Sequence, residues 1–265
     1  MLLCYYSNEG AHVSGVTVMA NAVERSNQLA ATTFWASRRR FLGWIGAGLA
    51  ALAIPRPLWA VTDPKATYSE TIAVLSVLYR AEVGSHLRYK AYETQAMKDG
   101  HVNIAHLFAA TADSESVHAT RFREILSKLG VQVETPEQLA TQLQITSGTT
   151  KDNLKYATDV ELSEIDVRYP EYLARIQPEK HKNALKYIEY SWKAEQQHRE
   201  LIKDIQSGTG IFFGMLAEKF RSTKVRYFVC QNCGSTLTVM PTEKCPVCGF
   251  LIKWYKEIMP PQPEG

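Results

Sequence analysis

The sequence lacks several features that would place it in common protein classes. Its most apolar segment, Phe41 to Ile54, is shorter than the roughly 20 residues that a membrane-spanning helix requires. A net charge of +3, with no basic face interleaved with aromatic residues, argues against a nucleic-acid partner. Cysteine is almost absent before residue 230, which argues against a disulfide framework. The 265 residues leave room for a helical domain, a leader and one small module.

Residues 1–60 are predicted to be a leader that carries an export signal. Arginines at positions 38–40 are followed directly by Phe41-Leu42, a Gly- and Ala-rich apolar stretch and two prolines. This pattern resembles a twin-arginine signal. We expect export by the twin-arginine machinery, cleavage after Ala60 and a periplasmic location, in preference to an uncleaved membrane anchor. That route carries folded proteins, which suits a protein that receives its cofactor in the cytoplasm.

From Thr67 to about Gln206 the sequence predicts four helices with few interruptions. The predicted boundaries between them are Gly100, Gly130, a polar link at 135–150 and Pro178, which should open the fourth helix. Tyr169-Pro170 falls inside the third helix and should kink or split it, because proline cannot donate a backbone hydrogen bond. The predicted fold is therefore mainly α.

Each predicted helix has an apolar seam that carboxylates interrupt near its middle. The acidic and imidazole residues on these seams are Glu82, Glu115, His118, Glu161, Glu164, Glu195 and His198. A carboxylate buried without a partner costs several kcal/mol, and these seams offer Arg168 as the one plausible cation. Two divalent metal ions would nearly neutralise the five carboxylates.

The spacing of these residues supports a pair of metals. Glu115 and His118, like Glu195 and His198, lie three apart on a helix, so both side chains leave the same face about 5–6 Å apart at Cβ. A glutamate from each of the other two helices completes the pattern of ferritin-like di-iron proteins. Carboxylate oxygens with one imidazole per metal suit iron or manganese better than copper or zinc.

Four cysteines form two copies of one short motif near residue 240. Cys230 and Cys233 precede one glycine, Cys245 and Cys248 precede another, and residues 234–244 separate the pairs. Such knuckles place four thiolates in a tetrahedron around iron or zinc, and the motif alone does not separate the two metals. A pair of disulfides formed after export is the alternative. The aromatic residues expected to form a dry shell are Tyr227, Phe228, Phe250, Trp254 and Tyr255.

With both modules in this order, the chain resembles the rubrerythrins from about Ser69 to Tyr255. The resemblance implies a ferritin-like four-helix bundle at 66–207, a linker at 208–224 and a small rubredoxin-like, zinc-ribbon-like β domain at 225–258. Its implied di-iron ligands are Glu82, Glu115, His118, Glu161, Glu164, Glu195 and His198. The implied ligands of a mononuclear iron are Cys230, Cys233, Cys245 and Cys248.

The resemblance also implies a role for each di-iron ligand. Glu115 and Glu195 would bridge two irons, with Glu82 terminal on one of them. His118 and Glu164 would exchange on that iron as its oxidation state changes. Glu161 and His198 would hold the other iron. Tyr89 and Tyr169 would form hydrogen bonds to the ligand carboxylates.

The function implied is that of an oxidoreductase that reduces hydrogen peroxide to water. Electrons would pass through the four-cysteine iron site from an unidentified donor protein, NAD(P)H-linked or otherwise, within a head-to-tail homodimer. Two alternatives stay open: a ferroxidase or iron-storage protein, and a non-catalytic redox sensor with a zinc ribbon. Among the other histidines, His86 is expected to be partly exposed, and His101, His106 and His181 should lie at the surface because they fall off the seams.

Overall fold

A computed structural model describes residues 63–206 and 225–262 of the chain, except the side chains of residues 160–164 and 204–206. The predicted leader, with its twin-arginine motif, and the predicted linker lie outside the described residues. None of the helices within the described residues combines the length and the apolar character needed to cross a membrane.

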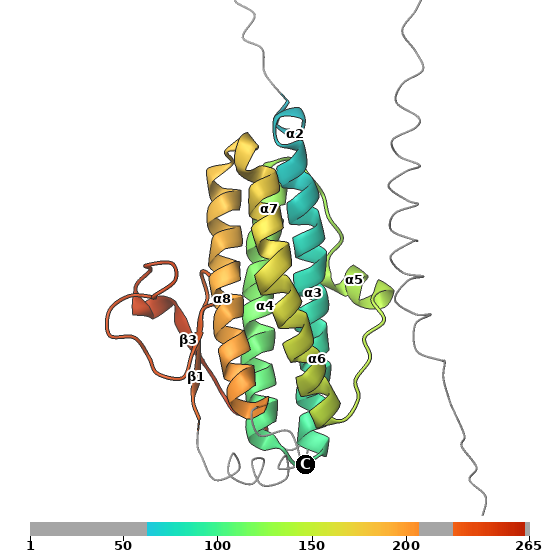
Figure 1. Cartoon of the computed structure of the whole chain (residues 1–265), viewed down its shortest axis with the longest axis vertical. Coiled ribbons are helices and arrows are strands. Elements are labelled where there is room, and N and C mark those ends of the chain that lie inside the picture. The colour runs from blue at the N-terminus through green and yellow to red at the C-terminus, as the bar shows by residue number, and fades with distance from the viewer. Residues whose placement is uncertain (1–62, 207–224, 263–265) are drawn as a thin grey trace, which may run out of the picture. The chain divides into compact units, whose positions relative to one another are not determined.

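Four long helical segments lie side by side and form the bundle, as predicted (Figure 1). The segments are α3 (Ser69–Lys98), α4 (Val102–Lys128), α6 (Thr150–Ser163) continued by α7 (Tyr169–Ile176), and α8 (Lys182–Gln206), preceded by the short α2 (Pro64–Thr67). The third segment is split, as Tyr169-Pro170 predicts: a π-helical turn, η1 (Glu164–Arg168), separates α6 from α7. Pro170 lies in the first turn of α7, where its missing N–H costs no helical hydrogen bond.

Two of the predicted helix boundaries are correct and one is wrong. Gly100 and Gly130 follow α3 and α4 with φ of 77° and 74°, a left-handed conformation that glycine adopts without steric cost. Pro178 does not open the fourth helix. It lies in a short 3-10 turn, η2 (Gln177–Glu179), and α8 begins at Lys182, after Lys180 turns the chain with φ of 54°.

The polar link between the second and third helices contains a helix that was not predicted, α5 (Pro136–Gln142). Thr135 accepts a hydrogen bond from the backbone N–H of Gln138, whose side chain accepts one from the backbone N–H of Thr135. This capping box, with Pro136 in the first turn, is a sequence signal for a helix start. The buried Leu139 then anchors α5 in the bundle core.

The bundle core consists of two apolar clusters. One gathers Leu75, Tyr79, Phe122, Ile125 and Ile188, with Ile176 of α7. The other gathers Tyr92, Ile104, Phe108, Leu154 and Ile202. Along α4 and α8 the predicted metal ligands fall between the two clusters in sequence, and on α3 Glu82 lies at the edge of the first cluster, beside Val83. The acidic level of the bundle is thus flanked by apolar side chains on both sides.

The cysteine module is a small antiparallel sheet, which confirms the predicted β domain. Its strands are β1 (Tyr227–Cys230), β2 (Thr236–Leu237) and β3 (Tyr255–Ile258), with a 3-10 turn η3 (Ile252–Trp254) before β3. β1 is central, in the order β2-β1-β3. Tyr227, Val229 and Ile258 complete the apolar cluster around Phe108, so the module packs against the bundle.

Candidate metal centres

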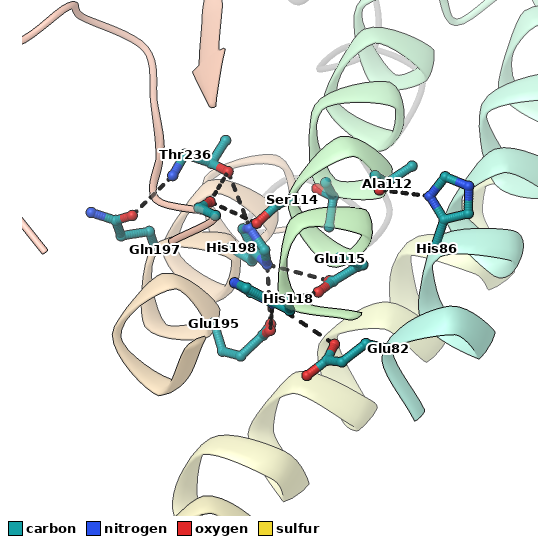
Figure 2. Close-up of polar contacts among 12 residues, drawn as sticks. Glu82, His86, Ala112, Ser114, Glu115, His118, Glu195, Gln197, His198 and Thr236 are labelled. Atoms are coloured by element: carbon teal, nitrogen blue, oxygen red, sulfur yellow. Dashed lines mark hydrogen bonds and ion pairs between the residues drawn. The ribbon is translucent and has the colours of Figure 1, made fainter. Parts of the chain in front are cut away.

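Three helices bring five of the predicted ligands together at one level of the bundle. Glu82 comes from α3, Glu115 and His118 from α4, and Glu195 and His198 from α8 (Figure 2). Each of these side chains is buried, with at most 3% of its surface exposed. The Glu and His of each pair are three residues apart and leave the same face of their helix, as predicted, so both side chains point into the same space.

The two histidines share the two carboxylates between them. Nδ1 of His118 lies 3.0 Å from Glu115 Oε2 and 3.1 Å from Glu195 Oε1. Nδ1 of His198 lies 3.0 Å from Glu195 Oε2 and 3.5 Å from Glu115 Oε1. Each carboxylate therefore presents one oxygen to each imidazole, which is the geometry that a bridging ligand needs. Glu82 stands on the His118 side, with Oε2 at 3.8 Å from His118 Nδ1.

The third helical segment carries two more predicted ligands and the predicted cation. Glu161 and Glu164 have side chains outside the described residues, so their roles stay predictions. Arg168 is not a buried counter-ion: it is exposed and lines a surface pocket with Arg80 and Arg88. The π-helical turn at Glu164–Arg168 changes the helical phase, which explains why counting by threes and fours placed Arg168 on the seam.

Burial and mutual charge set the protonation of the acidic cluster. Desolvation raises the pKa of Glu82 well above its ordinary value, and the neighbouring carboxylates add to the rise. Desolvation opposes ionisation of Glu195 too, but the charge of His198 and hydrogen bonds from both histidines outweigh it and hold that pKa well below the ordinary value. Despite desolvation, Glu195 raises the pKa of His198 to about 9. The cluster requires positive charge, from protonated imidazoles or from metal ions.

The donor set fits two divalent cations. Potential ligand atoms of Glu82, Glu115, His118 and Glu195 all lie within 4.8 Å of one another. Glu195 Oε1 is buried, and its close neighbour is His118 Nδ1 at 3.1 Å, another potential ligand atom, so one metal could contact both atoms. Hard oxygens with an imidazole on each side suit iron.

The two tyrosines expected beside the carboxylates lie in different surroundings. The hydroxyl of Tyr169 donates to Glu82 Oε1 over 2.8 Å, as the sequence predicts. Tyr89 is buried in the apolar cluster, where its ring stacks on Phe108 with centroids 5.9 Å apart. Its hydrogen bond to a ligand carboxylate stays a prediction.

The four cysteines form the second centre. Cys230 and Cys248 have Sγ atoms 3.8 Å apart, and Cys233 and Cys245 have theirs 3.6 Å apart, so the cysteines are free and not disulfide-bonded. Four thiolates at about 2.3 Å from one metal stand roughly 3.8 Å apart in a tetrahedron, so the site fits iron or zinc. Hydrogen bonds from Cys230 and Cys233 lower the pKa of Cys248 to about 6, which favours its thiolate.

The predicted aromatic shell around the cysteines is only partly formed. Tyr255 donates a hydrogen bond to Cys245 Sγ over 3.2 Å, and Tyr227 and Phe228 are buried. Phe250 and Trp254 are each 38% exposed and Cys248 is partly exposed, although Cys245 is buried, so this side of the site lacks the dry surround that was expected. The module is too small to cover all of its apolar side chains.

The first knuckle and β2 contact the two histidines of the acidic cluster. His118 Nε2 lies 3.2 Å from the carbonyl oxygen of Cys233. His198 Nε2 lies 3.2 Å from the hydroxyl of Thr236 (Figure 2). A carbonyl can only accept, so His118 Nε2 carries the proton in this contact. Its Nδ1 then faces the carboxylates as the metal-binding nitrogen. The cysteine module thus orients imidazoles of the other centre.

Several residues of this contact could not be found from the sequence. Ser114 donates to the carbonyl of Gly234 over 2.6 Å, and Gln197 accepts from the backbone N–H of Thr236 over 3.0 Å. His106, expected at the surface, is in fact 3% exposed, with Nε2 at 2.6 Å from the carbonyl of Ile258. Helix periodicity places these residues on the outside of the bundle, and it carries no signal for where a second module docks.

The remaining histidines agree better with expectation. His86 is half-buried, and its Nδ1 lies 2.8 Å from the carbonyl of Ala112, outside the acidic cluster (Figure 2). His101 and His181 are half-buried at the ends of helices. None of these three imidazoles joins the groups of possible metal ligands among the described residues.

Comparison with known proteins places these sites in a family. The sequence profile of the rubrerythrins matches residues 74–206. Rubrerythrin-2 of Clostridium acetobutylicum is 29% identical over 182 residues, covering 68% of this chain and 91% of that protein. A putative rubrerythrin of Methanocaldococcus jannaschii is 27% identical over 196 residues, covering 71% and 92%. Solved nigerythrin structures, mixed-valent and fully reduced all-ferrous, share the fold with a TM-score of 0.59 at 22% identity, covering 71% of this chain and 86% of nigerythrin. Because the profile spans more than half of the chain, the chain belongs to the rubrerythrin family.

Proposed function

We propose that this chain reduces hydrogen peroxide to water at a di-iron centre and that the four-cysteine iron site returns the electrons one at a time. As a rubrerythrin the chain is an oxidoreductase with a di-iron and a rubredoxin-like iron site. The observation that carries the electron relay is the contact between the two centres: the carbonyl of Cys233, a ligand of one, accepts a hydrogen bond from His118, a ligand of the other.

The residues of the acidic cluster would have different roles in binding the metals. Bound iron supplies the electrons that break the O–O bond of peroxide. Glu115 and Glu195 each offer one oxygen to either side of the site. Tyr169 fixes Glu82 by donating to its Oε1, which leaves Oε2 turned toward His118. The apolar clusters on both sides keep bulk water from competing for these oxygens.

The remaining ligand roles rest on the family pattern. We propose that Glu161 completes the His198 side of the centre and that Glu164 exchanges with His118 as the iron changes oxidation state. The support is that both glutamates belong to the third helical segment, at or beside the π-helical turn. Such turns recur at functional sites because they break the regular helical register.

The test is a comparison of oxidants. Iron-loaded protein is reduced without oxygen, then mixed with peroxide or with air-saturated buffer, and absorption is followed in time. We expect peroxide to oxidise both centres much faster than air does, and the oxidised four-cysteine iron to give a red colour. Equal rates with the two oxidants would refute the peroxidase, and a colourless module that holds zinc would refute the relay.

A serine variant separates the two steps. Cys245→Ser removes one thiolate of the four-cysteine site and leaves the acidic cluster intact. We expect one round of peroxide-driven oxidation at the di-iron centre, without renewed turnover when an external reductant is supplied. Sustained turnover in this variant would show that electrons reach the di-iron centre by another route.

We further propose a head-to-tail homodimer, in which each module meets the bundle of the other chain through the same residues. The support is that the hydrogen bonds of the contact join the surface of α4 and α8 to the surface of the module. These two surfaces fit each other equally well when the module comes from a second copy of the chain. The test is to co-express Cys245→Ser with Glu195→Ala and to isolate the mixed species. Activity in the mixture, with each variant inactive alone, supports the exchange of modules; inactivity refutes it.

Export is proposed on sequence grounds alone. We propose that residues 37–60 direct the chain through the twin-arginine machinery to the periplasm, where a donor protein reduces it. The support is the arginine run before Phe41-Leu42 and the apolar stretch that follows. Replacing Arg38, Arg39 and Arg40 with lysine should leave full-length protein in the cytoplasm, as measured by fractionation and N-terminal sequencing. Unchanged export would refute the assignment.

A further inference from the structure

The two cysteine knuckles end in glycines with the same backbone conformation but different surroundings. Gly234 has φ of 78° and Gly249 has φ of 73°. A Cβ at Gly234 would lie 2.2 Å from His118 Nε2 and 2.7 Å from Ser114 Oγ. A Cβ at Gly249 would meet nothing within 4 Å. Both glycines adopt a left-handed turn, but of the two only Gly234 also lies against the other metal centre.

The groups around Gly234 cannot yield to a side chain. His118 is 1% exposed, and its Nδ1 is held by Glu115 and Glu195 at 3.0 and 3.1 Å. Ser114 is fully buried. Atoms this closely packed do not move aside for an added methyl group, so the module itself would have to shift.

The backbone beside Gly234 makes the contacts that such a shift would break. Across the contact, the Gly234 carbonyl accepts a hydrogen bond from Ser114 Oγ at 2.6 Å; within the module, it also accepts one from Thr236 Oγ1 at 3.0 Å. The preceding carbonyl, of Cys233, accepts from His118. The missing side chain is therefore what lets a peptide that carries a cysteine ligand lie against an imidazole of the acidic cluster.

We propose that Gly234 is a positioning residue for electron transfer between the two iron sites, in addition to its role in the knuckle turn. The inference rests on the proposed function, because it assumes that electrons pass from the cysteines to the di-iron centre. Gly249 provides the matched comparison. Alanine at Gly249 imposes the same backbone strain without the clash, so any difference between the two alanine variants comes from the contact with His118 and Ser114.

The experiment compares full-length, iron-loaded wild type, Gly234→Ala and Gly249→Ala. Visible absorption establishes that the four-cysteine site is filled. Hydrogen exchange follows the backbone N–H of Thr236, which donates to Gln197 across the contact. Stopped-flow absorption then measures how fast reduced cysteine-site iron is oxidised after peroxide is added. We expect Gly234→Ala to lose Thr236 protection and to slow this step by about ten- to a hundredfold relative to Gly249→Ala.

A second variant reaches the same contact from the bundle side. Ser114→Val adds a methyl group against Gly234 and removes the hydroxyl donor, without altering either knuckle. It should reproduce the loss of protection and the slower transfer even if Gly234→Ala fails to bind iron. The proposal is overturned if a folded Ser114→Val protein matches wild type, or if both alanine variants behave alike.

Failure of the proposed function gives a different result. If wild type does not pass electrons from the cysteine site after peroxide addition, the relay is wrong whatever the variants do. In that case, loss of Thr236 protection in Gly234→Ala but not in Gly249→Ala would still establish that Gly234 positions the module on the bundle. The absence of transfer in wild type would overturn the role of Gly234 in electron transfer.

Discussion

The two metal centres of this chain are built in opposite ways. The cysteine site takes all four ligands from two short turns within residues 230–248, and Cys248 is partly exposed. The acidic site takes its described ligands from α3, α4 and α8, and every one of them is at most 3% exposed. A centre of the first kind is specified locally, whereas one of the second kind exists only when distant helices pack together.

This difference determines what holds each region in its fold. The bundle has two apolar clusters that do not involve the metal ligands. The cysteine module has three short strands and a cluster formed mainly by the cysteines themselves, with Tyr190 and Tyr255 against it. A domain this small seldom folds on its core alone and depends on a staple, which here is the metal.

The largest effect should come from removing both metals. Binding of a structural metal contributes about 10–16 kcal/mol to such small domains, so a chelator should unfold the cysteine module. The bundle should keep its helices, because nearly all the side chains of its two apolar clusters come from the helices themselves. Far-ultraviolet circular dichroism would report the helices, and hydrogen exchange of β1 would report the module.

A matched variant checks the direction of that effect. Cys233→Ser should unfold the module as chelation does, while Glu195→Gln should leave the module folded and empty only the acidic site. The comparison between the two regions would be wrong if chelation melted the bundle together with the module in one transition.

How much the sequence predicts follows from the same contrast. The cysteine ligands needed only local spacing. The helical ligands needed a period of three to four residues, which holds along α3, α4 and α8 and fails at the π-helical turn, where Arg168 leaves the seam. The helix α5 was missed because its segment is polar and was predicted to be a link, although the capping box of Thr135 and Gln138 is a sequence signal for a helix start.

The docking of one region on the other lay beyond sequence reasoning. His106 is buried because β3 covers it, and Gly234 matters because His118 lies against it. Neither fact is encoded in a repeat or a spacing, since the partners are more than 100 residues apart and belong to different modules. Pairing between surfaces of separate modules leaves no periodic pattern in either one.

The next effect concerns the acidic site alone. Tyr169→Phe removes the hydroxyl that donates to Glu82 Oε1, leaving a buried carboxyl oxygen without this partner. We expect a loss of about 1–3 kcal/mol in the free energy of unfolding and weaker iron binding. Tyr172→Phe, on the same helix and partly buried, should change stability by less than about 0.5 kcal/mol. Equal effects in the two variants, measured by denaturant titration, would count against a role for the hydroxyl.

A smaller effect concerns the contact between the two regions. Arg121 donates to the carbonyls of Gln231 and Asn232 at 2.9 and 3.1 Å and also pairs with Glu124. Arg121→Ala should cost about 1.5 kcal/mol, or roughly tenfold in the ratio of docked to undocked module. Glu124→Ala removes only the surface ion pair and should change this ratio little. Hydrogen exchange at Thr236 measures both, and equal protection in the two variants would contradict the expectation.

The smallest effect is a pH dependence that belongs to the bundle alone. Asp99, at the end of α3, accepts hydrogen bonds from the hydroxyl and the backbone N–H of Thr150, and from Gln95, which lower its pKa below the ordinary value. A pKa that is lower in the folded state gives stability that is present above the unfolded value, near 3.8, and lost as pH falls through the folded value. Asp99→Asn should be less stable than wild type by less than about 1 kcal/mol at pH 6, with the gap closing toward pH 2. Thr150→Val keeps the Asp99 carboxylate but removes the hydroxyl that donates to it, so this variant should show part of the stability loss of Asp99→Asn at pH 6. The test is the denaturant midpoint of the helical signal, measured for each protein after chelation at several pH values. A stability difference between wild type and Asp99→Asn that stayed constant with pH would show that the Asp99 carboxylate does not link α3 to α6.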